Sequence, residues 1–330
     1  MAWKRIGLVL GGAGAAAWYW LWRTPPARHL PAPSPCTTYG EALARAQALI
    51  GRAEGTLQVG CETRLWTHGR RTPKAVVFLH GFTNCPKQFE QLAALCFGRG
   101  WNVIVPRFPH HGLQERRPPA LATMTTEDVL TVAADAVDIA CGLGEEVVVA
   151  GLSLGGATTA WLAHERSDIR RAVIISPALG YFIFNDALLP LLSRMIALRP
   201  NGWVWWDPTT RDADDRLPHA YPGFQSHALA AVMRMGLLVR QAARRRAPRC
   251  PEIILITNPA DPSVTVPPQD MLAANWRGHG GNVQRRILPA EWEAIHDLID
   301  PMQEKQQIER VYPVVMAAIA APQVISGTES

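Results

Sequence analysis

Ser153 stands in a sequence context that can make a serine a nucleophile. It lies at the centre of the segment Gly151–Gly155 (Gly-Leu-Ser-Leu-Gly), after an apolar run at 147–150 and before small, helix-compatible residues at 157–164. This pattern predicts a buried strand, a sharp turn and a helix, with the serine at the apex. The two glycines would let strand and helix approach closely, while Ser153 would adopt a strained backbone conformation. Alone, the pattern equally describes a glycine-rich turn with an incidental serine, so its partners must decide.

A serine hydroxyl becomes an effective nucleophile when a histidine takes its proton and a carboxylate orients that histidine. Such partners collect at the carboxyl ends of parallel strands. Asp261 follows a strand-like run at 253–257, and His296 follows another at 283–288. The chain order Ser153, Asp261, His296 is one in which such triads occur. We therefore predict these three residues as catalytic.

Other histidines and carboxylates fit the role less well. His110 and His111 follow a strand-like run but precede the serine, and a role in loop structure explains them. His164 lies late in a predicted helix and is expected at the surface. Asp297 is adjacent to His296, a poor position for orienting its imidazole, and we expect it to cap the following helix.

Acyl transfer places negative charge on a carbonyl oxygen, so donors must already point at that position. The backbone N–H of Leu154, directly after the serine, is one predicted donor. The second is expected in the loop after the first parallel strand, His80-Gly81-Phe82, where Gly81 permits close approach. We predict the Phe82 N–H as this donor, and a structural hydrogen bond within the loop for His80.

Short apolar runs alternate with helical patterns along most of the chain. Strands are predicted at 75–79, 101–106, 146–150, 172–177, 253–257 and 283–288, with helices between them. This alternation predicts an α/β fold with a mainly parallel sheet flanked by helices. From about 178 to 250 it is interrupted by helical patterns at 188–198 and 226–243, which predicts a helical cap over the site. Trp203, Trp205 and Trp206, in an irregular stretch, fit either a pocket for an acyl or aromatic group or the cap's own core.

The N-terminal region predicts a membrane attachment. Residues 1–23 hold Lys4 and Arg5, then an apolar run that ends in aromatic residues, which favours an uncleaved anchor with a cytoplasmic N-terminus. A cleaved signal peptide, and hence a secreted protein, is the alternative. Either way, the catalytic domain would lie outside the cytoplasm. The proline-rich residues 24–38 predict a stiff spacer, residues 39–322 the main domain and residues 323–330 a tail.

Composition limits the class of protein. The 330 residues are 48% hydrophobic with a net charge of +5, which suits one catalytic domain, and no nucleic-acid-binding module is present. The six cysteines lack zinc-site or Cys-x-x-Cys spacing. In an oxidising compartment some would pair, Cys36 with Cys61 being one possibility. The sequence indicates neither the connectivity nor the oligomeric state.

Four motifs in order resemble the α/β-hydrolase superfamily: His80-Gly81-Phe82-Thr83, Gly151–Gly156, Asp261-Pro262 and His296-Asp297. Within it, residues 74–320 are most similar to bacterial carboxylesterases and monoacylglycerol-lipase-like enzymes, although His110 stands where related sequences often carry glycine. The resemblance implies an α/β-hydrolase fold with a helical cap. It also implies an esterase or lipase that acts on small-molecule or lipid esters through an acyl-enzyme, with no metal or organic cofactor. Thioesterases and amidases share this chemistry, and a non-catalytic membrane-tethered binding protein is the alternative from another class.

Overall fold

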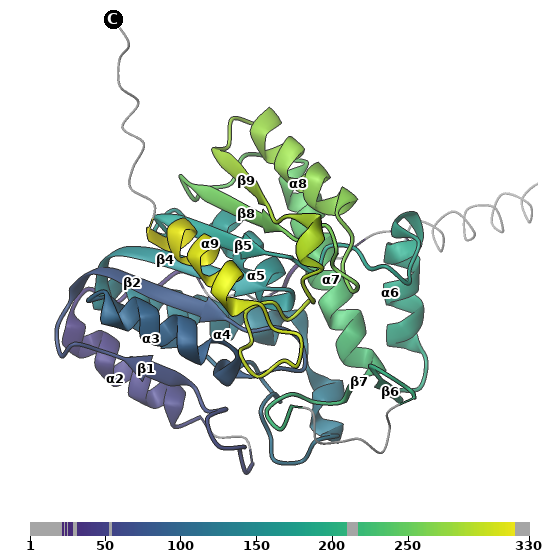
Figure 1. Cartoon of the computed structure of the whole chain (residues 1–330), viewed down its shortest axis with the longest axis horizontal. Helices are drawn as coiled ribbons and strands as arrows, with labels where there is room; N and C mark the ends of the chain where they lie inside the picture. The colour runs from purple at the N-terminus through teal and green to yellow at the C-terminus, as the bar shows by residue number, and fades with distance from the viewer. Residues whose placement is uncertain are drawn as a thin grey trace, which may run out of the picture.

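A seven-stranded sheet, in the order β1-β3-β2-β4-β5-β8-β9, forms the centre of the computed structural model, which describes residues 22, 24, 26–28, 32–52, 55–209 and 217–320 (Figure 1). All neighbouring strands are parallel except β1, which runs antiparallel to β3. The strands are β1 (Arg64–Trp66), β2 (Thr72–Leu79), β3 (Asn102–Val105), β4 (Gly144–Leu152), β5 (Arg171–Ile175), β8 (Ile253–Thr257) and β9 (Val283–Ile287). The predicted α/β class with a mainly parallel sheet is therefore confirmed.

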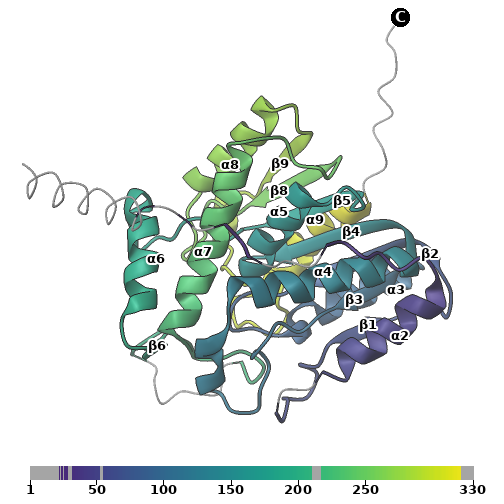
Figure 2. The same ribbon diagram turned by 180° about the vertical axis from the view of Figure 1, so that it is seen from behind.

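The sheet is buried on both faces, as its β-branched, almost continuously apolar strands require. In β2, Val77 and Leu79 belong to one hydrophobic cluster, while Val76 and Phe78 belong to the other. The first cluster includes residues of α2 (Tyr39–Ile50), α4 (Thr126–Leu143), α5 (Leu154–Glu165), α7 (Ser226–Ala243) and α8 (Pro267–Gly278). The second includes residues of α3 (Glu90–Gly98) and α9 (Ile308–Ala320). Figures 1 and 2, which view the molecule from opposite sides, show these two helical layers with the sheet between them.

The segment between β5 and β8 adds further elements beside the sheet, and one of them, α7, also packs in the first helical layer. This segment contains α6 (Leu189–Leu198), β6 (Trp203–Trp205), β7 (Gly223–Gln225) and α7. Both predicted helices are present, but the stretch around the tryptophans is not irregular: β6 pairs antiparallel with β7. Trp203 and Trp205 alternate with Val204, so both rings lie on one face of this ribbon, with centroids 5.9 Å apart.

The predicted N-terminal anchor, residues 1–23, lies outside the described residues apart from Trp22, and the tail 323–330 lies outside them as well. Within the described ranges, no helix combines the length and apolar character needed to span a bilayer. The described part of the proline-rich segment lies along the domain. The Arg28 N–H donates to the Glu127 carboxylate at 3.0 Å, and the Ser34 N–H donates to Asp138 at 3.1 Å.

Candidate active site

Ser153 occupies the sharp turn between β4 and α5. Its backbone has φ 58° and ψ −114°, a conformation that a non-glycine residue rarely adopts, so the predicted strain is confirmed. Three backbone hydrogen bonds hold it there. The Ser153 N–H donates to the Ile175 carbonyl at 3.1 Å, and its own carbonyl accepts from the N–H groups of Ala157 and Ala178. The strain is thus sustained by the neighbouring strand and helix.

The glycines around Ser153 leave no room for a side chain. A β-carbon at Gly155 would overlap the Leu79 carbonyl oxygen at the end of β2, and one at Gly151 would lie 2.6 Å from the Thr159 hydroxyl oxygen. Real β-carbons essentially never approach other atoms so closely. The predicted close approach of strand and helix is therefore confirmed.

Asp261 and His296, which are 35 residues apart and were predicted from the ends of two strands, are in direct contact. The His296 Nδ1 lies 3.0 Å from Asp261 Oδ1 and 2.8 Å from Oδ2. The loop after β8 orients the carboxylate, because the N–H groups of Ser263 and Val264 both donate to Oδ1, at 2.8 and 3.0 Å. With Nδ1 donating its proton to Asp261, Nε2 carries the lone pair that a general base needs.

Burial and charge act in opposite directions on this pair. Burial alone would raise the pKa of Asp261, but the charge and hydrogen bond of His296 and the two backbone donors lower it overall. Burial alone would lower the pKa of His296, but Asp261, through its charge and hydrogen bond, and the charge of Asp297 raise it overall. The Asp261 side chain is 1% exposed and that of His296 is 18% exposed, so the ring keeps a solvent-accessible part.

The connection between Ser153 and the Asp261–His296 pair is indirect. No hydrogen bond joins its hydroxyl to His296 among the residues that the structure describes. A β-carbon at Gly81 would lie 3.8 Å from the Ser153 β-carbon, and the Gly81 N–H donates to Gln88, which in turn donates to Asp297 beside His296. Ser153 and the His296 loop therefore lie at the same edge of the sheet. Catalytic hydrogen bonds are often long without substrate and tighten in the complex.

Residues 80–85 are named the oxyanion loop after the donor predicted in them, and the Phe82 N–H has no hydrogen-bond partner within the described part of the chain. The Gly81 carbonyl, on the same peptide unit, accepts from the Asn84 N–H at 3.3 Å and from His80 Nδ1 at 2.9 Å. Because the peptide is trans, fixing this carbonyl directs the Phe82 N–H the opposite way. Neither this N–H nor that of Leu154 makes a hydrogen bond to another residue in the described ranges, so both remain able to bind a ligand oxygen.

His80 is a structural part of this loop, as predicted. Its Nε2 accepts from the Phe108 N–H at 3.0 Å, so its Nδ1 carries the proton that goes to Gly81. Burial holds the pKa of His80 well below its ordinary value. The ring is therefore neutral, as this pair of hydrogen bonds requires.

Two expectations about other residues were wrong. Asp297 caps no helix, because α9 begins only at Ile308. Its carboxylate accepts from Gln88 and Gln303, and burial raises its pKa to about 6. His164 is buried rather than exposed, and its Nδ1 accepts from the Trp276 indole at 3.2 Å. A predicted helix pattern does not by itself say which of its faces another helix covers.

His110 and His111 stabilise their own loop, as expected. His110 adopts a positive φ of 61° and hydrogen-bonds with the Thr123 hydroxyl at 3.1 Å. His111 is fully buried, with Nδ1 2.8 Å from the Pro109 carbonyl. Burial lowers the pKa of His111 to about 3, so it is neutral and donates this proton to the carbonyl.

Three side-chain contacts at this edge were not predicted from the sequence. Asn258, directly after β8, donates to the Ala294 carbonyl at 2.7 Å and so connects the Asp261 and His296 loops. A polar residue at a strand end was the signal for it. His219 and Asp300 form a buried pair 2.8 Å apart, and Asn84 also donates to Asp300 at 3.3 Å. No local pattern marks that pair.

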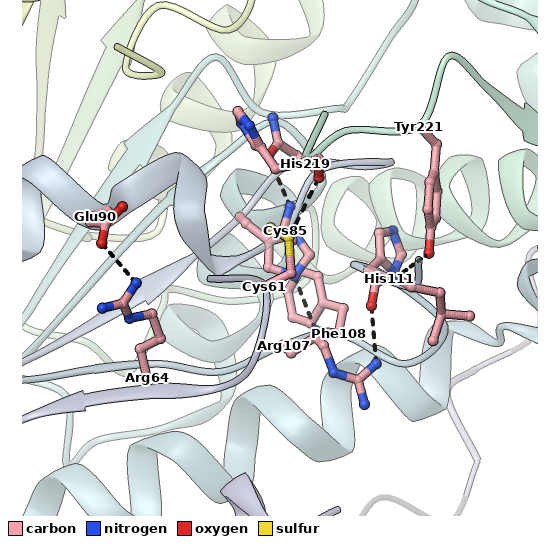
Figure 3. Close-up of a disulfide and its surroundings, with 12 residues drawn as sticks. Cys61, Arg64, Cys85, Glu90, Arg107, Phe108, His111, His219 and Tyr221 are labelled. Carbon is pink, nitrogen blue, oxygen red and sulfur yellow. Dashed lines mark hydrogen bonds and ion pairs between the residues drawn. A yellow bond between two sulfur atoms is a disulfide. The ribbon is translucent and has the colours of Figure 1, made fainter. Parts of the chain in front are cut away.

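A disulfide joins Cys61 to Cys85, the last residue of the oxyanion loop. The possible pairing of Cys36 with Cys61 was wrong: Cys36 is free and buried, with its N–H bound to the Asp138 carbonyl on α4. The Cα atoms of Cys61 and Cys85 lie 5.2 Å apart, within the range that disulfides span. Figure 3 shows His219 close to this bridge, and the Cys61 sulfur is 3.8 Å from the His219 carbonyl oxygen.

The β6–β7 ribbon rests on the oxyanion loop. The Trp206 indole donates to the Thr83 hydroxyl at 3.0 Å, and the Tyr221 N–H donates to the Thr83 carbonyl at 2.8 Å. The Phe82 ring lies 6.1 Å from Trp206 and 5.7 Å from Phe224, measured between centroids. Aromatic side chains of the segment between β5 and β8 thus lie beside the ring of Phe82, the residue of the predicted oxyanion donor.

Residues 76–291 match the model of the alpha/beta hydrolase family. The chain belongs to this family. The match includes the strained serine, Asp261 and the oxyanion loop, and it ends shortly before His296. The match establishes the family and its fold, and it does not establish a particular activity.

Proteins similar to this chain in sequence or structure include lipases and esterases. A thermostable monoacylglycerol lipase from Bacillus sp. (strain H-257) is 29% identical over 106 residues, which are 32% of this chain and 41% of that enzyme, so the match spans less than half of its length. Among solved structures, one from a study of the metagenome-derived lipolytic enzymes LipS and LipT has a TM-score of 0.61 at 21% identity, covering 80% of this chain and 99% of that one. The monoacylglycerol lipase of Paleococcus ferrophilus has a TM-score of 0.56 at 17% identity, with 78% and 97% covered. These structures support the alpha/beta hydrolase fold.

Proposed function

We propose that this alpha/beta hydrolase is a serine hydrolase that cleaves carboxylic esters through an acyl-enzyme. The contact between Asp261 and the Nδ1 of His296, at the sheet edge where Ser153 occupies a strained turn, carries the proposal. A carboxylate that fixes the tautomer of a histidine, at the same sheet edge as a serine in a strained turn, is the arrangement that activates a hydroxyl. The predicted roles of these residues are part of the proposal.

The reaction proceeds in two acyl-transfer steps. The Ser153 oxygen attacks the ester carbonyl while His296 Nε2 takes the hydroxyl proton, and Asp261 stabilises the imidazolium. The N–H groups of Phe82 and Leu154 donate to the oxyanion. The C–O bond to the alcohol then breaks, and His296 returns the proton to the leaving alcohol. Water then attacks the acyl-enzyme while His296 takes its proton, and as the bond from the acyl carbon to the Ser153 oxygen breaks, His296 gives this proton to Ser153 and the acid leaves.

The substrate we propose is an ester with an apolar acyl group, of the carboxylesterase or lipase type. Phe82, Trp206 and Phe224 place aromatic surface beside the proposed oxyanion site, and Trp206 is 51% exposed. Binding of an apolar acyl chain against this surface would be favourable, because it removes apolar area from water. The named relatives reported above are lipolytic enzymes, which agrees with this class.

Ser153→Ala tests the proposal against a matched control. We expect kcat/KM for a p-nitrophenyl ester to fall by about 10⁴-fold or more, with the melting temperature retained. Ser193 is an equally buried serine in α6, whose hydroxyl donates to the Ala230 carbonyl, and Ser193→Ala should keep activity within about twofold of wild type. Retained turnover in Ser153→Ala would reject the assignment.

A substrate series then separates the related activities. Esters of increasing chain length, with a matched thioester and amide, should be compared on the same preparation. Preference for short soluble esters would identify a carboxylesterase, and activation at lipid interfaces a lipase. Faster turnover of the thioester or the amide than of the ester would contradict the proposed substrate class.

A further inference from the structure

We propose that Gln88 is a positioning residue that holds the Phe82 peptide in register with the loop that carries His296. The inference rests on the proposed function, because it assigns Gln88 to the oxyanion site and general base of that reaction. Gln88 touches neither substrate nor reacting atoms in this account. It acts through the two loops that it joins.

One side-chain amide spans the two loops. Gln88 lies in the short 3₁₀ helix η1 (Pro86–Phe89) and is fully buried. Its Oε1 accepts from the Gly81 N–H at 2.8 Å, and its Nε2 donates to Asp297 Oδ1 at 3.1 Å. Gly81 directly precedes Phe82, and Asp297 directly follows His296. The Gln88 amide is therefore hydrogen-bonded to the residue before Phe82, the proposed oxyanion donor, and to the residue after His296, the proposed general base.

The partners allow only one orientation of this amide. The Gly81 N–H can only donate, so it faces the amide oxygen, and the NH₂ group must face the Asp297 carboxylate. The reverse orientation would place two donors together and an oxygen against a carboxylate. Because the amide is planar and buried, its two hydrogen bonds fix the separation of the loops as well as their connection.

The sheet itself does not set this separation. The oxyanion loop follows β2 and the His296 loop follows β9, and three strands, β4, β5 and β8, lie between them. Side-chain contacts must therefore fix the relative position of the two loops. Asn84 makes a second link through Asp300, but it is longer, at 3.3 Å. Gln88 instead binds the backbone N–H next to Phe82.

Displacement of this loop should reduce the rate more than the binding. A misplacement of about 1 Å costs on the order of 10²-fold in rate, because the donors must point at the oxyanion of the transition state. We therefore expect Gln88→Met, which removes both hydrogen bonds at similar volume, to lower kcat by about 10- to 100-fold. KM should change by less than about threefold, since the bound ester gains little from these donors before attack.

Gln88→Glu separates positioning from packing. It keeps the acceptor for the Gly81 N–H but places a second carboxyl group against Asp297, so the two must share a proton to stay in contact. Asp297 also faces the charges of His296, Asp261, Asp300 and His219. The ratio of kcat in Gln88→Glu to kcat in wild type should rise as the pH falls from about 9 to 6, whereas the ratio for Gln88→Met should stay flat.

Asn102→Leu is the control, because Asn102 begins β3 at the end of the sheet opposite the site. Asn102 is equally buried, accepts from the His68 N–H at 2.9 Å and donates to the Leu143 carbonyl at 2.8 Å. It should lose stability as Gln88→Met does, but keep kcat within about twofold of wild type. If Gln88→Met keeps kcat within about twofold as well, the positioning role is overturned while the proposed function stands.

Two further outcomes decide between the positioning role and the proposed function. If Gln88→Met does not fold, the pH series of Gln88→Glu decides: a rising ratio supports the positioning role, and a flat ratio overturns it. If the wild-type chain hydrolyses no ester and Ser153 reacts with no serine-directed probe, the proposed function fails, and the role of Gln88 fails with it.

Discussion

Replacement of Asp261 by asparagine should disable the proposed general base without disturbing its surroundings. The reason lies in how the loop after β8 holds the carboxylate. The N–H groups of Ser263 and Val264 both donate to Oδ1, whereas among the described residues Oδ2 has a hydrogen bond with His296 Nδ1 alone. In the variant, the two backbone donors select the amide oxygen for the first position.

The amide NH₂ must then take the second position and face His296 Nδ1. A donor there makes Nδ1 an acceptor, so the neutral ring carries its proton on Nε2, the atom that should take the serine proton. The wrong tautomer in a Ser-His-Asp site lowers kcat by about 10⁴-fold. At about 1.36 kcal/mol for each tenfold change, this is about 5.4 kcal/mol of transition-state stabilisation.

The assay compares kcat/KM for a short ester in wild type, Asp261→Asn and a control. Asp270→Asn removes a half-exposed carboxylate on α8 that pairs with Arg285, and it should leave kcat/KM within about twofold of wild type. Asp261→Asn should lose about 10⁴-fold and keep its secondary structure by circular dichroism. A variant that retained more than about a tenth of wild-type activity would show that the Asp261–His296 contact does not set the tautomer of the base.

Three further perturbations test the site and its support. Because the pKa of His296 is raised and the base must be deprotonated, the acid limb of the pH profile of kcat/KM should have its midpoint above 6.5. Replacing both Cys61 and Cys85 by alanine should lower the free energy of unfolding by about 3 kcal/mol, measured by denaturant titration, from the loop entropy of a 24-residue separation; an unchanged value would contradict this. Gly155→Ala should yield little soluble folded protein, whereas Gly98→Ala, with open space at the β-carbon, should yield normal amounts.

Features that depend on local pattern could be predicted from the sequence. The strands β4 and β5 are runs of β-branched residues, and the turn at Ser153 needs glycines that only a close approach explains. Asp261 and His296 could be placed together because both follow strands of one parallel sheet, whose carboxyl ends share an edge. The steric need for glycine at a close approach and the shared edge of parallel strands can both be inferred from the order of residues in the sequence.

Contacts between distant segments could not be predicted in the same way. His219 and Asp300 are separated by 81 residues, and neither lies in a patterned element. Gln88 lies in a 3₁₀ helix of four residues, too short for a sequence pattern to indicate that its amide is buried between two loops. The β6 strand has only three residues, too few for its alternation to be distinguished from an irregular stretch.

The most direct test of the account is the site of covalent reaction with a fluorophosphonate. The purified chain should be treated with the probe, digested and analysed by peptide mass spectrometry, alongside Ser153→Ala and His296→Ala. The account predicts a single modified residue, Ser153, with no labelling in Ser153→Ala and labelling slowed by about 10²-fold or more in His296→Ala. Labelling of another serine, or equal labelling of Ser153 without His296, would contradict it.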